Sequence, residues 1–341
     1  MAARPAHPWE KTLPMLAFLV RRVLGGIVIL AIISLITFLL FFAVPGSDVA
    51  ALSCGKTCTP ENMALIRRGL GLDKPVIVQY LVFMGGIFAT RTIGDNVCTA
   101  PCLGYSFVNH QPVLQTVLDR LPVTLSLAIG AVVLFIIFGV GLGMLAALRK
   151  GKLADKIAMT FALIGGSMQI FVLAPFFLYI FVYTTGLLPQ PRYVSFFDSP
   201  GDWFIGMLLP WLCLAIIYIA YYARLTRSSM VDVLNEDFIR TVRAKGLGTG
   251  QIYVKHAFRG AMSPVVTILG LDIAGLFAGA IITEQSFGLV GVGQLAVNSV
   301  NNSDLPMMMG VVLLAATAVV LANIIVDVIY AVIDPRIKVS A

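Results

Sequence analysis

Six long apolar runs constrain the fold more than any other feature of this sequence. A membrane-spanning α-helix needs about 20 consecutive apolar residues, because each residue adds about 1.5 Å and the hydrocarbon core is about 30 Å thick. The runs that reach this length are 23–47, 121–148, 157–191, 203–223, 260–283 and 305–326. The sequence therefore predicts an integral membrane protein with six spans.

The spans are expected to be helices and not the strands of a barrel. Five of the six runs contain no charged residue, whereas the strands of a membrane barrel alternate apolar positions with polar positions that face the lumen. Hydrophobic residues make up 59% of the chain and charged residues only 12%, against roughly 25% charged residues in soluble domains. The predicted fold class is an all-α membrane protein.

The third run is too long for one straight crossing. Pro175 and Gly186 predict that its helix ends early and that the chain continues as an apolar outer segment. Pro189 and Pro191 are expected to close this segment.

The distribution of Lys and Arg predicts the orientation, because cytoplasmic loops retain positive charge. With the N-terminus inside, the inner segments carry 17 of these residues and the outer segments 7, of which six lie in the long first outer loop. Both termini are therefore expected in the cytoplasm. The same asymmetry accounts for the net charge of +7, so this charge gives no support to nucleic-acid binding.

The runs divide the chain into five expected parts. These are a cytoplasmic tail (1–22), a first span (23–47), an outer loop (48–120), a membrane domain (121–331) and a second cytoplasmic tail (332–341). The first span is longer than the core of a signal peptide and is expected to stay uncleaved as an anchor. The 13-residue apolar run 76–88 in the outer loop is too short to cross and predicts an interfacial or locally packed helix.

Four cysteines lie in the outer loop, Cys54 and Cys58 in CGKTC and Cys98 and Cys102 in CTAPC. Disulfides are favoured outside the cytoplasm, so we expect them to hold this loop together, although four cysteines allow three pairings. Free thiols and a four-cysteine zinc site are the alternatives. GKT at 55–57 lacks the first glycine of a phosphate-binding loop, so we expect no nucleotide site in this chain. We also expect it to bind no metal and no other cofactor.

Asp272 is the one ionisable residue deep inside a predicted span. A charge at the bilayer centre costs about 2.5 to 3.5 kcal/mol on insertion scales, so Asp272 should face a cavity, a partner or water. It either lines a translocation pathway or is a hydrogen-bonded packing residue. Ser167 and Gln169, which are polar residues in the third run, are further candidates for the pathway; each could instead bond a neighbouring helix.

The inner loop after the fourth span contains a predicted short helix over about residues 235–246. Asn235 can cap its start, Glu236 and Asp237 then lie at its positive end, and Gly246 is a natural terminator. Phe238, Ile239 and Val242 share an expected apolar side, while Arg240 and Arg243 lie on another face. A helix this short needs something to pack against. The membrane surface, the protein's own inner helix ends and a separate cytoplasmic protein are the conceivable partners.

The residues EDFIRTVRAKGLG, 236–248, closely resemble the cytoplasmic signature of binding-protein-dependent ABC importer permeases in the form EDYVRTARAKGLS, which is typical of the dipeptide, oligopeptide and nickel branch. Further segments similar to this branch are 21–47, 70–87 and 323–338, the last ending in DPRIK. The long first outer loop favours the B-type subunit. After the fifth span the branch often reads FSWPGLG; residues 287–293 read FGLVGVG here, which loses Trp-Pro and keeps the last two glycines.

This resemblance implies a non-catalytic permease whose short inner helix is a coupling helix that inserts into a groove on a cytoplasmic ATPase subunit. The coupling residues carried over from the signature are Glu236, Asp237, Phe238, Ile239, Arg240, Thr241, Val242, Arg243, Ala244, Lys245, Gly246 and Leu247. The resemblance also implies a second homologous permease, two ATPase subunits or one fused ATPase that bind ATP and Mg²⁺, and an extracytoplasmic solute-binding protein. The implied location of this complex is a bacterial inner membrane, with membrane lipids around it.

The implied function is import of peptides or peptide-like solutes, with half of the pathway formed by this chain. Relatives in the branch also carry nickel complexes or haem, and the sequence does not choose among these solutes. One rival is an ATP-independent carrier or channel that uses Asp272 as its coupling group. Another is a scaffold whose short helix lies on the membrane surface and which transports nothing.

Overall fold

The computed structural model describes residues 12–42, 50–51, 59–93 and 96–333. The chain divides into two compact units, residues 1–121 with 295–341 and residues 122–294. Within the described residues, four helices are long and apolar enough to cross a membrane, or up to six spans if two bent helix pairs each count as one. The predicted helical membrane fold is confirmed at this level.

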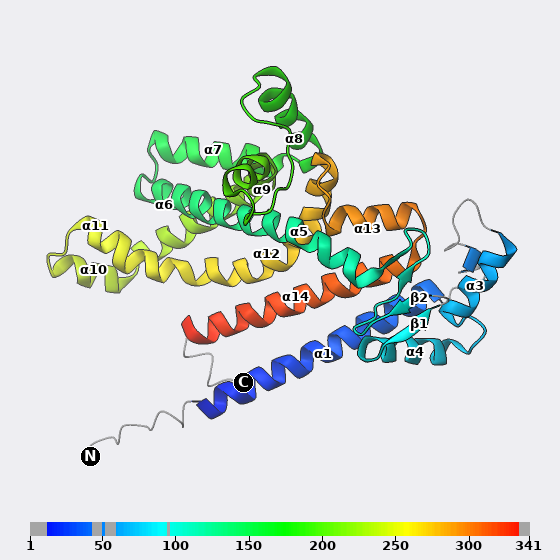
Figure 1. Ribbon diagram of the computed structural model, residues 1–341. Coiled ribbons are helices and arrows are strands. Elements are labelled where there is room, and N and C mark those ends of the chain that lie inside the picture. Colours follow the sequence, from blue (N-terminus) through cyan, green and yellow to red (C-terminus); the bar gives the residue numbers. More distant parts are fainter. Residues whose placement is uncertain (1–11, 43–49, 52–58, 94–95, 334–341) are drawn as a thin grey trace, which may run out of the picture. The chain divides into compact units, whose positions relative to one another are not determined.

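The first unit contains two long helices that lie side by side, α1 (Thr12–Phe42) and α14 (Leu305–Ile333) (Figure 1). α1 begins inside the segment 1–22 that the sequence analysis treated as a tail. The apolar run 76–88 forms α4 (Val76–Phe88), as expected of a locally packed helix. Its Tyr80 and Phe83 rings pack against Phe38 of α1, with ring centroids 5.4 and 6.0 Å apart.

The outer loop also contains α3 (Pro60–Leu70) and two short antiparallel hairpins, a departure from an all-α fold. β1 (Arg91–Ile93) pairs with β2 (Asn96–Cys98), and β3 (Tyr105–Ser106) pairs with β4 (Gln111–Pro112). The apolar spans could not predict these strands, because they are only two or three residues long.

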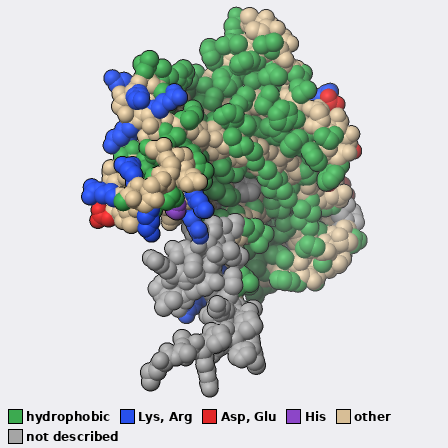
Figure 2. Space-filling view, turned by 90° about the vertical axis from the view of Figure 1, so that its left-hand side faces the viewer, with side chains coloured by type: hydrophobic (Ala, Val, Ile, Leu, Met, Phe, Trp, Pro, Cys, Tyr) green, Lys and Arg blue, Asp and Glu red, His purple; other side chains and the backbone are tan. Residues whose placement is uncertain are grey.

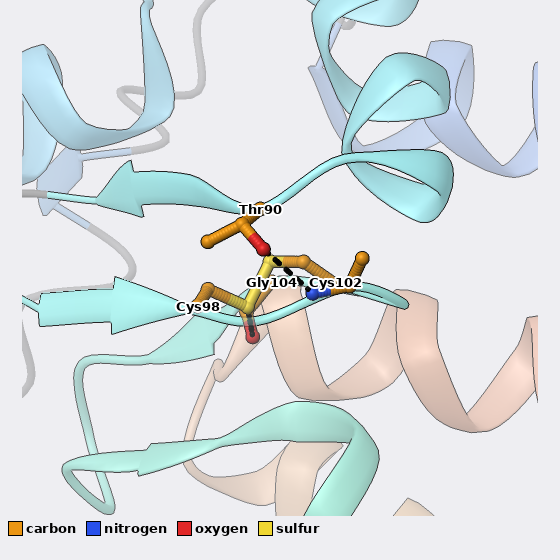
Figure 3. Close-up of a disulfide and its surroundings, with 5 residues drawn as sticks. Thr90, Cys98, Cys102 and Gly104 are labelled. Carbon is orange, nitrogen blue, oxygen red and sulfur yellow. Dashed lines mark hydrogen bonds between the residues drawn. A yellow bond between two sulfur atoms is a disulfide. The ribbon is translucent and has the colours of Figure 1, made fainter.

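A disulfide joins Cys98 at the end of β2 to Cys102 (Figure 3). Beside it, the Ala100 backbone N–H donates to the Thr90 hydroxyl over 3.3 Å. A four-cysteine zinc site needs both of these sulfurs as thiolates, and sulfurs joined in a disulfide are not thiolates. The disulfide therefore argues against the zinc site. Cys54 and Cys58 lie outside the described residues.

The second unit is built around α9 (Pro200–Leu234), which packs against α6 (Gly141–Leu148), α7 (Leu153–Ser167) and α12 (Phe258–Phe287) (Figure 1). α5 (Val113–Phe135) enters this unit and continues through a π-helical turn into α6. The buried side chains that fill the centre come mainly from α5, α8, α9 and α12 and include Phe135, Trp211, Leu214, Tyr222 and Leu276.

The third apolar run is broken at a different place from the one predicted. α7 and α8 (Ile170–Phe177) meet at a bend of 103° at residues 168 and 169. Pro175 lies inside α8 and does not end the helix, which continues as a π-helical turn to Thr184. The helix therefore ends close to Gly186, as expected, but Pro175 was the wrong signal for the break.

The fourth and fifth spans extend past their apolar runs. α9 continues to Leu234, so Arg224 and Arg227 are helical residues and not part of an inner loop. The Arg224 guanidinium donates to the Ala162 carbonyl over 3.1 Å. α12 continues to Phe287, which places Glu284 inside the helix. The helix bends by 80° from its last turns into α13 (Val292–Asn301).

Candidate coupling site

The short inner helix exists as α10 (Asp237–Ala244), eight residues long. Asn235 does not cap it, because Asn235 is the residue that ends α9, and Glu236 occupies the N-cap position without a side-chain cap bond. Gly246 has a φ of 79°, a left-handed conformation that favours glycine and turns the chain after α10. The helix therefore starts one residue later than a cap at Asn235 implies.

One side of α10 is anchored to the second unit by Ile239, which is fully buried. Ile239 packs in a cluster with Met230 and Val233 of α9 and with Ile252 and Ala257 near the start of α12. Val242 and Leu247 pack partly against the same cluster. α10 thus contacts the ends of two long helices, and a displacement of α10 must move them or break this packing.

The remaining residues of α10 face outward. Phe238 is 42% exposed and lies about 100° round the helix from the buried Ile239, so the residues of the predicted apolar side differ in burial. The exposed positions are Glu236, Asp237, Phe238, Arg240, Thr241, Arg243, Ala244, Lys245 and Gly246. Arg240 pairs with Asp237 of the same helix at 3.3 Å, with both side chains largely in solvent.

The outward face of α10 belongs to a basic surface. Figure 2 looks at the side on which α10 and α11 (Thr249–Gln251) lie in Figure 1, and Lys and Arg side chains gather there. Hydrophobic side chains cover most of the other described surface in this view. The arrangement combines an apolar anchor on one side with exposed positive charge on the other, which suits docking to an acidic protein surface.

An ion pair that the sequence analysis missed ties α7 to α9 in the same unit. Arg227 donates from Nε to Asp155 Oδ1 over 2.6 Å and from Nη2 to Oδ2 over 2.7 Å, and the Gly151 backbone N–H adds a bond of 2.9 Å to Oδ2. The Asp155 carboxylate is buried, whereas Arg227 is 29% exposed. The only sequence signal was a single Asp among Arg149, Lys150, Lys152 and Lys156, too common a pattern to single out.

The three candidate pathway residues lie in two places. Ser167 and Gln169 flank the bend between α7 and α8, both exposed, and the Ser167 hydroxyl donates to the Leu163 carbonyl. Asp272 lies on α12 and accepts a 2.9 Å bond from the Tyr222 hydroxyl of α9. No hydrogen bond joins Asp272 to Ser167 or Gln169 in the described part of the chain.

Glu284 is a second buried carboxylate, missed because the fifth span was ended at Thr283. It accepts bonds from the Thr124 hydroxyl at 2.6 Å and from the Gln294 backbone N–H at 3.0 Å, and Thr124 in turn accepts from the Val292 N–H. A side chain at Gly291 would overlap this carboxyl group. Any residue larger than glycine at position 291 would therefore displace the Glu284 carboxyl group.

Comparison with known proteins matches two families that cover most of the chain. Residues 15–128 match the N-terminal region of binding-protein-dependent transport system membrane components. Residues 139–339, which include α10, match the binding-protein-dependent transport system inner membrane component family.

Curated relatives span nearly the whole chain. A putative peptide transport system permease protein of Brucella abortus is 37% identical over 95% of this chain and 99% of its own length. The dipeptide transport system permease protein DppB of Escherichia coli K12 is 36% identical over the same shares. Among solved structures, the methionine ABC transporter MetNI in an inward-facing conformation shares the fold, with a TM-score of 0.51 and 14% identity over 65% of this chain and 97% of that one. The chain therefore belongs to the family of binding-protein-dependent transport system inner membrane components.

Proposed function

We propose that this chain forms half of the translocation pathway of an ATP-driven importer for peptides or peptide-like solutes and that α10 couples it to a cytoplasmic ATPase. The two-sided contact pattern of α10 is the observation that carries the proposal. Ile239 is buried in the second unit, while Phe238, Arg243 and Lys245 are exposed to solvent. A helix of eight residues is marginal alone in water, so this burial is what holds it in place.

The proposed coupling is mechanical. The outward face of α10 inserts into a groove on the ATPase, where Arg240, Arg243 and Lys245 pair with carboxylates. ATP and Mg²⁺ are held by the ATPase subunits and not by this chain. Closure of the ATPase pair then favours one permease conformation and hydrolysis releases it, so energy is transferred only as a difference in affinity between states.

The proposed complex also contains a second homologous permease, two ATPase subunits or one fused ATPase, and a solute-binding protein on the outer side. Support comes from the names of the relatives, which describe permeases of peptide and dipeptide transport systems, and from the fold shared with an ABC transporter. The excess of Lys and Arg in the inner segments supports an orientation with both termini in the cytoplasm.

Co-purification of the ATPase tests the proposal. The double charge reversal Arg240→Glu with Arg243→Glu removes positive charge from the outward face without touching Ile239. We expect it to release the ATPase from the purified complex and to abolish ATP-dependent uptake. Arg192→Glu, a reversal at an exposed position before α9, is the control and should retain both.

Two results would contradict the proposed coupling between α10 and the ATPase. ATPase binding that survives the double reversal at α10 contradicts the proposed interface. Uptake that continues without nucleotide and is abolished by Asp272→Asn would instead support an ATP-independent carrier.

A further inference from the structure

Asp272 lies near the middle of the 30-residue helix α12, about 20 Å from either end at 1.5 Å per residue. Its carboxylate can accept about four hydrogen bonds. Among the described residues it receives one, from the Tyr222 hydroxyl at 2.9 Å. The side chain is also partly exposed, so a molecule from outside this chain can reach the carboxylate.

The surroundings of Asp272 are aromatic and carry hydroxyl groups. Tyr218 and Tyr222 lie one turn apart on α9, and both rings pack on Phe135, with centroids 5.0 and 4.8 Å away. The Tyr218 hydroxyl approaches α12 at Gly275, about one turn beyond Asp272. A carboxylate beside tyrosine hydroxyl groups suits an ammonium group, because the negative charge attracts it and the hydroxyl oxygens can accept its hydrogen bonds.

The exposed stripe of α12 next to Asp272 is not typical of a lipid-facing surface. It runs at helical spacing through Ser263, Thr267, Leu271 and Gly275, three of them small or polar. The exposed stripe of α1 is fully apolar by comparison and includes Leu24, Val28, Ile32, Leu35 and Leu39. A carboxylate that faces lipid costs several kcal/mol. The contrast between the two stripes therefore places the Asp272 side of α12 against protein or an aqueous pathway.

We propose that Asp272, oriented by Tyr222 and assisted by Tyr218, binds the free ammonium group of the solute during its passage. This deepens the proposed function, on which it rests, because it assigns the solute to the amines, as in a peptide with a free N-terminus. The carboxylate accepts one or two charged hydrogen bonds from the ammonium group. No bond is made or broken, and the Tyr222 hydroxyl holds the carboxylate in place.

The test uses the assembled complex in proteoliposomes, with both permeases, the ATPase subunits and the solute-binding protein. ATP-dependent uptake of dialanine and of N-acetyl-dialanine is measured for the wild type and for Asp272→Asn. The ratio of the two uptake rates gives the preference for a free amine. Dividing the wild-type ratio by the variant ratio cancels any preference of the binding protein, which is the same in both measurements.

We expect Asp272→Asn to lower the preference by roughly tenfold, the size of a lost charged hydrogen bond. Asp272→Glu keeps the charge and should retain most of the preference. The matched control Asp73→Asn, at an exposed position in the outer loop, should leave the ratio unchanged. Should Asp272→Asn fail to assemble, Tyr222→Phe replaces it and should lower the ratio two- to threefold, because only the orienting hydroxyl is lost.

Two results overturn the ammonium site while leaving the importer intact. One is an unchanged ratio in a variant that still transports with ATP. The other is an equal loss of uptake for both probes, which is the result expected if Asp272 pairs with a cation of the second permease. If the wild-type complex shows no ATP-dependent uptake, the proposed function fails and this inference fails with it.

Discussion

Replacing Ile239 by Ala should detach α10 from the rest of the chain. The substitution removes three buried carbon atoms, worth about 0.8 kcal/mol each, and leaves a cavity, so the cost lies in the range of about 2 to 5 kcal/mol. A value near 3 kcal/mol lowers the ratio of docked to undocked α10 by roughly a hundredfold. The helix has no other fully buried side chain, so little else holds it.

Hydrogen exchange on the purified chain measures this docking directly. The amides that close α10 are those of Lys245, which donates to the Thr241 carbonyl, and of Gly246, which donates to Arg243. We expect Ile239→Ala to raise their exchange rates by roughly a hundredfold and Ile239→Val, which removes one methylene, by about tenfold or less. Phe238→Ala is the control, because Phe238 lies on the exposed side.

The same pair of variants should separate docking from ATPase binding in the assembled complex. Ile239→Ala leaves the outward face chemically intact, so we expect ATP hydrolysis to continue with less uptake per ATP. Phe238→Ala should weaken ATPase binding and keep the uptake per ATP. The reasoning is refuted if Ile239→Ala leaves exchange at α10 unchanged, or if Phe238→Ala raises it as much.

Substitutions in three buried polar groups are tested by thermal unfolding. Arg227→Met leaves the buried Asp155 carboxylate without its cation and should lower the free energy of unfolding by about 3 kcal/mol or more. Asp155→Asn leaves a cation that can still reach solvent and should lower it by less. Equal losses in the two variants would contradict this reasoning. Glu284→Ala orphans buried donors and should lower the melting temperature at least twice as much as Glu284→Gln, which keeps an acceptor. Burial raises the pKa of Asp304 above its usual value. The wild type should therefore lose stability relative to Asp304→Asn as the pH rises from about 4 through the raised pKa. If the two melting temperatures depend on pH in parallel, this prediction is wrong.

The prediction for Asp304 rests on bonds within the first unit. This residue is 1% exposed at the start of α14 and accepts bonds from the Ser106 hydroxyl at 2.5 Å, from Asn109 at 3.3 Å and from the Met307 backbone N–H at 3.3 Å. The three donors lower the pKa, but the loss of hydration outweighs them. The carboxylate thereby ties the hairpin of β3 and β4 to α14.

The apolar spans were predictable because the bilayer requires about 20 consecutive residues that are predominantly apolar. The ends of the spans were not, because they depend on single polar contacts. Arg224 donates a hydrogen bond to the Ala162 carbonyl and Arg227 donates to the Asp155 carboxylate, which stabilises the helix beyond the apolar run. The local sequence does not reveal these partners, because they lie about 60 to 70 residues away.

The candidate site was predictable to a similar degree. The signature resemblance located α10, and Gly246 marked its end correctly. The buried side was only partly foreseen: Ile239 docks and Phe238 does not, because the sides of a short helix are set by what it packs against. Asp272 was visible as a charge in an apolar run, but its tyrosine neighbours come from α9, about 50 residues earlier in the chain.

The polar groups of the second unit differ in how far this chain satisfies them, and this difference separates structure from function. Asp155 accepts hydrogen bonds from Arg227 and the Gly151 N–H, and Glu284 accepts them from Thr124 and the Gln294 N–H, all within the unit, so these carboxylates hold helices together. Asp272 receives one bond and remains partly exposed in the middle of a span, where an unsatisfied charge is costly. The proposed ammonium site requires a carboxylate that the described residues leave open to a further partner in this way. The proposed ATPase contact requires in turn that Arg240, Arg243 and Lys245 stay exposed, as they are in this chain.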